Sequence, residues 1–168
     1  MAIAYLSLGS NVGDRLSNLQ HAVKLLTESG VATVVRSSAF YETEPWGNKD
    51  LEWFVNAVIE IKTKLTPREL LKLCKDIEAK MGRVKTDSPD YQPRNIDIDI
   101  LFYGDMIIDE PDLIIPHKHL HERAFALVPL LELIPDYEHP KYKKSLLQLH
   151  DELTTVDDVY LYGTRIDI

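Results

Sequence analysis

Hydrophobic and polar positions follow two different periods along this chain, and the two periods alternate from segment to segment. Apolar residues recur at every second position, or β-branched residues cluster, in four segments that predict strands: 2–8, 31–41, 54–62 and 96–102. Two intervening segments, 16–26 and 67–81, repeat apolar residues at the three- and four-residue spacing of one helix face. The resulting order of strand, helix, strand, strand, helix, strand predicts an α+β fold with a mainly antiparallel sheet and helices packed on it.

Turn and cap residues predict where these elements begin and end. Thr66-Pro67-Arg68-Glu69 predicts the start of the second helix, because it combines a capping box with proline at the first helical position. Gly30 and Gly82 are expected just past the ends of the two helices. The segment 42–51 is rich in turn-forming residues and predicts a loop, and Gly104-Asp105 predicts a hairpin that leads into 106–108.

The last third of the chain gives weaker patterns. Three further elements are expected: a short helix at 124–133, a weak helix near 146–153 and a strand at 159–162. No repeat or low-complexity segment separates the chain into parts, so residues 1–168 are expected to form one domain.

Composition and charge narrow the class of protein. An apolar share of 45% and a charged share of 27% are typical of a globular protein. The net charge of −8 argues against general binding to nucleic acid or to an anionic membrane. The single cysteine, Cys74, excludes an internal disulfide and is expected in the core. Without an apparent leader peptide or membrane span, the sequence predicts a cytoplasmic protein.

Two carboxylates on one strand are the first candidate for chemistry. Asp97 and Asp99 alternate with isoleucines, so both side chains emerge on one face, roughly 6–7 Å apart at about 3.3 Å per residue. Such a pair repels itself, and Mg²⁺ would relieve the repulsion, since it is typically held by one or two carboxylates together with substrate phosphates. The alternative interpretation is an exposed polar strand face.

The segment 83–94 is long for a connection and nearly free of aliphatic residues. It holds three cations, Arg83, Lys85 and Arg94, and one aromatic residue, Tyr91. Long loops are usually functional or disordered, so this one is expected either to bind a metal-bridged polyphosphate or to be a solvated surface loop. No P-loop and no glycine-rich dinucleotide turn occurs elsewhere in the chain.

Three alternating histidines, His117, His119 and His121, leave three possibilities open. They could hold zinc, one of them could contact phosphate, or they could belong to an uninvolved surface. Zinc is the least favoured, because no cysteine accompanies the histidines and alternate positions on one strand lie too far apart for tetrahedral closure.

Taken together, the motifs of this chain resemble those of the 6-hydroxymethyl-7,8-dihydropterin pyrophosphokinase family. The matching motifs occur in order: Leu8-Gly9-Ser10-Asn11, Phe40-Tyr41-Glu42-Thr43, Phe54-Val55-Asn56-Ala57, Glu78, Gly82-Arg83-Val84, Pro93-Arg94-Asn95-Ile96-Asp97-Ile98-Asp99-Ile100-Leu101, Ile115-Pro116-His117 and Arg123-Ala124-Phe125. The resemblance implies a ferredoxin-like α+β core with a six-stranded antiparallel sheet. It also implies transfer of the β,γ-diphosphate of ATP to the hydroxymethyl group of the pterin, which leaves AMP.

The resemblance assigns the candidate residues to three groups. Asp97 and Asp99 would bind two Mg²⁺ ions, and Arg83 and Arg94 would act with them as catalytic residues on the transferred group. The ATP-binding positions would be Glu78, Ile100, Ile114, His117 and Arg123. The pterin-binding positions would be Thr43, Trp46, Phe54, Asn56, Tyr91 and Phe125, with the two phenylalanines on either side of the flat ring.

The chain departs from the family pattern at several positions. Asp90-Tyr91-Gln92 stands where the family commonly has Arg-Trp-Gly, Lys118 stands where an aromatic residue is frequent, and Lys75 where an amide is often found. Two other classes remain as alternatives. One is a non-catalytic ferredoxin-like module that binds a metal or a ligand, and the other is a metal-dependent phosphodiesterase that uses the same two aspartates.

Overall fold

The computed structural model describes residues 1–44, 52–82, 95–154 and 158–163. Its centre is an antiparallel sheet of six strands in the order β5-β1-β4-β3-β8, with β2 also paired to β4. The strands are β1 (Ala2–Ser10), β2 (Ala32–Ser37), β3 (Phe40–Thr43), β4 (Phe54–Thr63), β5 (Asp97–Tyr103) and β8 (Val159–Gly163). The prediction of an α+β fold with a six-stranded antiparallel sheet is therefore confirmed.

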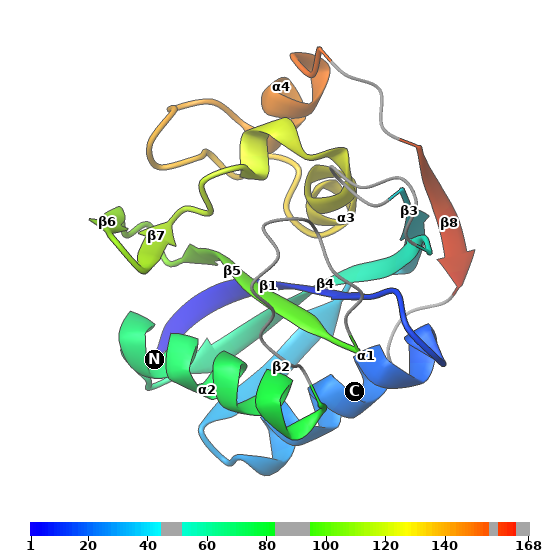
Figure 1. Ribbon diagram of the computed structural model, residues 1–168. Coiled ribbons are helices and arrows are strands. Elements are labelled where there is room, and N and C mark those ends of the chain that lie inside the picture. The colour runs from blue at the N-terminus through cyan, green and yellow to red at the C-terminus, as the bar shows by residue number, and fades with distance from the viewer. Residues whose placement is uncertain (45–51, 83–94, 155–157, 164–168) are drawn as a thin grey trace.

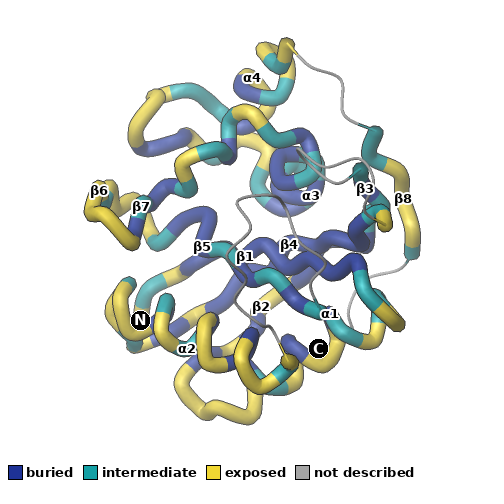
Figure 2. Tube along the Cα trace, in the orientation of Figure 1, coloured by how far each residue is buried: buried dark blue, intermediate teal, exposed yellow. Residues whose placement is uncertain are grey.

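Helices cover both faces of this sheet (Figure 1). Helices α1 (Arg15–Glu28) and α2 (Pro67–Lys80) pack on one face, and α3 (Ala124–Leu133) and α4 (Leu146–Asp151) lie on the other. Each layer has its own cluster of buried side chains. Strand β4 contributes to both clusters, since Val58 belongs to one and Ile59 to the other. All of its residues except Lys62 are buried (Figure 2). This double burial is why both faces of β4 carry apolar residues, while its buried polar residues Asn56 and Glu60 are hydrogen-bonded.

The predicted helix boundaries are confirmed by the caps. The Thr66 side chain accepts a hydrogen bond from the Glu69 backbone N–H, and the Glu69 carboxylate accepts one from the Thr66 N–H, which completes the capping box of α2. Gly82 follows α2 with a φ of +88°, a conformation that favours glycine. Cys74 is fully buried, as predicted, and burial raises the pKa of its thiol to about 12.

The predicted hairpin from β5 into 106–108 is wrong. A turn does form there, with the Met106 N–H donating to the Tyr103 carbonyl. The chain does not return along β5, however, but forms a separate hairpin of β6 (Ile108–Glu110) and β7 (Leu113–Ile115). In this arrangement the side chains of Leu113 and Ile115 are buried in the α1–α2 layer. Pro111 and Asp112 form the turn between β6 and β7.

Two other boundaries also differ from the prediction. The segment 31–41 forms two strands, because strand structure is interrupted between Ser37 and Phe40. At this interruption the Glu132 carboxylate of α3 accepts a hydrogen bond from the Ala39 N–H. The predicted loop 42–51 begins later than expected, since Glu42 and Thr43 belong to β3. Within the described ranges, no helix combines the length and the apolar character that a membrane crossing needs. The cytoplasmic location and the single domain over 1–168 stay predictions.

Candidate active site

Neighbouring strands bring a residue of the predicted metal-binding group and one of the predicted pterin-binding group onto one face of the sheet. Gly9 of β1 lies opposite Asp97 of β5 on one side and opposite Asn56 of β4 on the other. Directly opposed residues of an antiparallel sheet point to the same face, and strands lie about 4.8 Å apart. The carboxylate of Asp97 and the amide of Asn56 therefore emerge from the same row of the sheet, about 10 Å apart at their backbones.

Gly9 is required in the middle of this row. A Cβ placed on Gly9 would lie 2.5 Å from the Asn56 Oδ1 atom and 3.4 Å from the ring of Phe54. Any side chain here would displace the amide that faces the acidic strand. The motif Gly9-Ser10-Asn11 thus has a packing reason that the sequence analysis did not give.

A concave pocket of about 390 Å³ opens beside this row and contains most of the predicted nucleotide-binding residues. Its walls include six of the residues predicted from the sequence: Asp97, Asp99, Ile100, Ile114, His117 and Arg123. Lys75 of α2 and Lys118 line it as well, so cations stand beside the acidic pair. We call this cavity the acidic-strand pocket.

The electrostatics of this pocket make Asp99 an unusual carboxyl group. Burial, and then the neighbouring Asp97 carboxylate, raise the pKa of Asp99 to about 7, while Arg123 and Lys75 partly oppose the shift. The side chain nevertheless keeps 33% of its exposure, so its oxygens remain reachable from the pocket. A carboxylate whose ionised form is destabilised by burial and by a neighbouring carboxylate, in an accessible pocket, is suited to a divalent cation.

Glu78 of α2 lies beneath the acidic strand and is 1% exposed. Its Oε2 accepts a hydrogen bond from the backbone N–H of Ile98 at 2.9 Å, and its Oε1 lies 3.3 Å from the Lys75 ammonium group. Ile98 stands between the two aspartates, so this buried contact fixes the strand at the point where both carboxylates emerge. Glu78 is not among the residues that line the acidic-strand pocket.

His117 faces Asp99, with its Nε2 atom 4.0 Å from Oδ2. Burial first, and then the charge of Arg123, lower the pKa of His117 to about 4, so the imidazole is neutral near pH 7. Its Nδ1 atom accepts the backbone N–H of His119, which leaves the proton on Nε2. His117 therefore presents an N–H donor to the pocket rather than a positive charge.

The predicted pterin residues that the structure describes fall into two places. Asn56 and Phe54 are buried on β4, and the Asn56 amide donates to the Thr43 hydroxyl across the β3–β4 pair. Phe125, at the start of α3, is partly buried in the α3–α4 layer, with the Arg123 guanidinium 5.4 Å from its ring centre. Trp46, Arg83, Tyr91 and Arg94 lie outside the described residues.

The histidines do not form a metal centre in the described part of the chain, where no group of three or more metal-ligating side chains occurs. They also do not share a strand. His119 precedes the short 3₁₀ helix η1 (Leu120–Glu122), and His121 lies within it. The rings of His117 and His119 are 6.3 Å apart.

Sequence reasoning missed three contacts near the start of β4. The Arg15 guanidinium of α1 donates to the Trp53 carbonyl at 2.8 Å and pairs with Glu42 at 2.9 Å, while Asn11 donates to the Glu52 carbonyl. The only signal for this in the sequence is the position of Asn11 and Arg15 directly after β1, which does not reveal their distant partners.

Fold and site together define a class of protein: an antiparallel α+β protein whose acidic strand opens into a pocket suited to metal-bound phosphates. The chain belongs to the 7,8-dihydro-6-hydroxymethylpterin-pyrophosphokinase family, whose model matches residues 5–135.

Relatives and solved structures agree with this assignment. The chain is 47% identical to the 2-amino-4-hydroxy-6-hydroxymethyldihydropteridine pyrophosphokinase of Methylorubrum extorquens, over 81% of this chain and 85% of that protein. It is 44% identical to the enzyme of the same name from Bacillus subtilis, over 81% and 80%. A crystal structure of wild-type Plasmodium falciparum HPPK-DHPS with pteroate shares the fold, with a TM-score of 0.71 at 19% identity, over 90% of this chain and 44% of that one.

Proposed function

We propose that this chain transfers the β,γ-diphosphate of ATP to the hydroxymethyl group of 6-hydroxymethyl-7,8-dihydropterin, with Mg²⁺ held at Asp97 and Asp99. The products are AMP and the pterin diphosphate, as expected for a folate-biosynthesis enzyme of this family. The observation that carries the proposal is the row Asp97–Gly9–Asn56, which sets an acidic pair and a pterin-type amide on one face of the sheet.

The donor set fits Mg²⁺ bound jointly with a nucleotide. The two carboxylates lie in one accessible pocket, and the described residues supply no third metal-ligating side chain to complete a protein-only site. This is the pattern in which Mg²⁺ takes its remaining ligands from water and phosphate oxygens. The chemistry supplied by two such ions is neutralisation of phosphate charge and a lower pKa for the hydroxymethyl oxygen.

The nucleotide would occupy the acidic-strand pocket. The Arg123 guanidinium would bind phosphate oxygens, and the neutral imidazole of His117 would donate its Nε2 proton to another. Backbone groups near Ile100 and Ile114 would recognise adenine. Glu78, which the family resemblance places at an ATP-contacting position, would act at least through its hold on Ile98.

The pterin would lie beside Asn56. The amide of Asn56 and the hydroxyl of Thr43 would bind the polar edge of the ring, and Phe54 and Phe125 would pack on its faces. Trp46 and Tyr91 would complete the site by family resemblance. The hydroxymethyl oxygen would then attack the β-phosphorus, AMP would leave, and Arg83 and Arg94 would stabilise the charge that develops.

One assay tests this proposal against both alternatives. AMP should form from ATP and Mg²⁺ only when 6-hydroxymethyl-7,8-dihydropterin is present, in equal amount to the pterin diphosphate. A phosphodiesterase would release AMP without the pterin, and a non-catalytic module would release none. Either of those results would overturn the proposal.

The metal assignment has a separate test. Asp97→Asn and Asp99→Asn should each lower kcat at least about a hundredfold, because a metal ion contributes several kcal/mol of charge stabilisation. Circular dichroism should stay that of the wild type, because the core does not need these charges. Asp76→Asn, an exposed change on α2, is the matched control and should leave turnover unchanged. Near-normal AMP production by Asp97→Asn at ordinary Mg²⁺ would contradict the assignment.

A further inference from the structure

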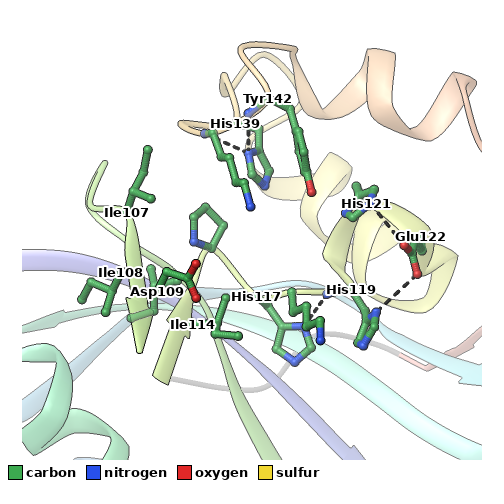
Figure 3. Close-up of a pocket in the computed structure, with 14 residues that line it drawn as sticks. Ile107, Ile108, Asp109, Ile114, His117, His119, His121, Glu122, His139 and Tyr142 are labelled. Atoms are coloured by element: carbon green, nitrogen blue, oxygen red, sulfur yellow. Dashed lines mark hydrogen bonds and ion pairs between the residues drawn. The ribbon is translucent and has the colours of Figure 1, made fainter. Parts of the chain in front are cut away.

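A second cavity, of about 410 Å³, is shown in Figure 3. It adjoins the acidic-strand pocket, because both are lined by Ile114, His117, Lys118 and His119. The β6–β7 hairpin forms one wall, and η1 and the turn that follows His139 form the other. We call it the histidine pocket and define it by His119, His121, His139, Lys118, Lys141 and Tyr142. The diphosphate transfer proposed above assigns no role to His121, His139 or Lys141.

Within the described ranges, the His139 ring carries a hydrogen-bond donor with no acceptor. The residue is 1% exposed, and its Nδ1 atom accepts the backbone N–H groups of Lys141 and Tyr142 at 3.1 and 3.2 Å. Burial lowers the pKa of the ring to about 4, so near pH 7 its one proton sits on Nε2. This Nε2 is enclosed and has no partner among the described residues, and Figure 3 shows it on the cavity side of the ring.

His121 stands in a similar position across the ring of Tyr142. Its Nδ1 atom is enclosed without a partner in the described ranges, while its Nε2 lies 3.3 Å from the Glu122 carboxylate. The Tyr142 ring centre is 4.7 Å from that of His121 and 4.6 Å from that of His139. Buried polar atoms without partners are uncommon in folded proteins, and two around one cavity indicate that the cavity takes a polar occupant.

The cavity lining carries two cations and two carboxylates. Lys118 and Lys141 both line it, and Lys141 lies 5.8 Å from the centre of the Tyr142 ring. Of the two carboxylates in the lining, Glu122 is already engaged by His119 and His121 at 3.3 Å each. Asp109 on the opposite hairpin is the second carboxylate, so the formal charge of the lining is zero. The preference for an anion rests on the His139 donor, which has no acceptor among the described residues, and on the adjacent Lys141.

We propose that the histidine pocket binds a phosphate group, with the His139 Nε2 proton as the directional donor and Lys118 and Lys141 as the cations. A tetrahedral phosphate offers several acceptor oxygens in different directions, which matches donors that converge from separate elements. The Nε2 atom is enclosed, so phosphate binding requires rotation of Lys141 and Tyr142, which flank the His139 ring and are both exposed. The proposal goes beyond the diphosphate transfer and does not depend on it.

The first test observes His139 directly. Inorganic phosphate is titrated into the full chain without nucleotide, Mg²⁺ or pterin, and the histidine side-chain nitrogens are followed by NMR. The His139 Nε2 signal should shift saturably, while the Nδ1 signal keeps the position of an unprotonated acceptor. The half-exposed His150 on α4 should stay unchanged. Absence of a saturable shift at His139 would overturn the proposal.

Two substitutions of His139 distinguish loss of the Nε2 donor from loss of the fold. His139→Asn places an amide oxygen near the former Nδ1 and removes the Nε2 donor, whereas His139→Gln extends an amide to the former Nε2 position. By calorimetry, His139→Asn should bind phosphate about tenfold or more weakly, as expected for a lost hydrogen bond to a charged group, and His139→Gln should bind within about threefold of the wild type. Equal affinity of His139→Asn and the wild type would contradict the proposal.

A third substitution covers the case in which both His139 variants lose their fold. Lys141→Met should also weaken phosphate binding about tenfold, because one of the two cations is lost. The matched control is Lys24→Met on α1, whose ammonium group is exposed near Glu28 and far from the pocket in sequence. If Lys141→Met and Lys24→Met bind phosphate alike, the site is not in this pocket.

Two further measurements, with methyl phosphate and with Zn²⁺, identify what the histidine pocket binds. Methyl phosphate in place of inorganic phosphate distinguishes a site for phosphomonoesters from one that accepts only the free ion, and binding of either supports the proposal. Zn²⁺ that saturates His121 and His139 while phosphate has no effect would overturn it in favour of a metal site. Asp97→Asn should leave the phosphate response of His139 intact, so failure of the diphosphate transfer and failure of this site are distinguishable.

Discussion

Gly9 shows how one missing side chain can shape a site. Its neighbours across the sheet are Asp97 and Asn56, and the space that a Cβ would fill is occupied by the Asn56 amide. Backbone freedom is not the reason for glycine here, because Gly9 lies in a regular strand. The requirement is steric, and it acts on the side chain that would bind the pterin.

The first prediction follows from this contact. Gly9→Ala should force the Asn56 amide away from Thr43 and lower the affinity for the pterin about tenfold or more, while the affinity for ATP changes less. Overpacking should also lower the unfolding free energy by about 1–3 kcal/mol. Calorimetry with each ligand measures the first effect and urea denaturation the second. Gly163→Ala is the control, because its nearest neighbour to a Cβ is 3.8 Å away.

A second residue-scale feature is the buried carboxylate of Glu60. It is 7% exposed and accepts hydrogen bonds from the Tyr5 hydroxyl at 2.6 Å and from the Arg36 guanidinium at 2.9 and 3.1 Å. Burial raises the pKa of Glu60, but the hydrogen bonds from Tyr5 and Arg36 lower it by more. The pKa of Glu60 therefore lies below its ordinary value of 4.5. Burial, together with Glu60, raises the pKa of Tyr5 to about 12.

The second prediction is the pH dependence that this network causes. Because the folded-state pKa of Glu60 lies below its unfolded value, ionised Glu60 adds stability that is complete above the unfolded pKa. That stability is lost as the pH falls through the folded pKa. In urea denaturation, the wild type should therefore lose more unfolding free energy between about pH 5 and about pH 3 than Glu60→Gln does. Parallel pH profiles for the two proteins would exclude this role.

At the scale of elements, the packing of α2 against β5 determines where the acidic pair emerges. The connection is the hydrogen bond from the Ile98 N–H to the buried carboxylate of Glu78. On the other side of the sheet, Glu132 of α3 accepts hydrogen bonds from the Ala39 N–H and the Tyr41 hydroxyl and so holds the junction of β2 and β3. In both cases a helix carboxylate binds a strand at an irregular or functional point.

The third prediction concerns the α2–β5 contact. Glu78→Ala leaves the buried Ile98 N–H without an acceptor and should lower the unfolding free energy by about 1–3 kcal/mol and kcat by at least about tenfold. Glu78→Gln retains an acceptor and should recover most of the stability. Thermal denaturation and steady-state rates measure the two effects, with the exposed Lys72→Ala on the same helix as control. A stable, fully active Glu78→Ala protein would show that the contact does not position the aspartates.

The molecule as a whole has two apolar layers that share one sheet. Leu26 of α1 and Leu130 of α3 are both fully buried, one in each layer. Because β4 contributes residues to both layers, separation of either layer from the sheet would expose the β4 side chains that it buries and weaken the strand that supports the other layer.

The fourth prediction is that the two layers unfold together. Leu26→Ala and Leu130→Ala should each lower the unfolding free energy by about 2–5 kcal/mol, the cost of a buried cavity. In each variant, the urea transitions followed by tryptophan fluorescence and by circular dichroism should coincide. Leu147→Ala, a 48% exposed position on α4, should change the stability by less than about 0.5 kcal/mol. Separate transitions in either core variant would mean that the layers are independent.

The sequence by itself determined most of the elements and the placement of Asp97 and Asp99 on one face of a strand. The two-residue period of 54–62, the capping box at Thr66 and the alternation around Asp97 and Asp99 are local patterns, and each acts through backbone geometry within a few residues. For the same reason, the order of strands and helices, and with it the fold class, could be predicted before any contact was known.

Only the tertiary structure decided which distant residues meet. The hairpin of β6 and β7, the break between β2 and β3, the Glu78–Ile98 hydrogen bond and the opposition of Gly9 to Asn56 all depend on pairings between segments far apart in the chain. A local pattern states which face a residue occupies, but not which neighbour lies across it. Strand pairing and helix packing supply that neighbour, because burial of the two apolar layers selects one register among many that the local patterns allow.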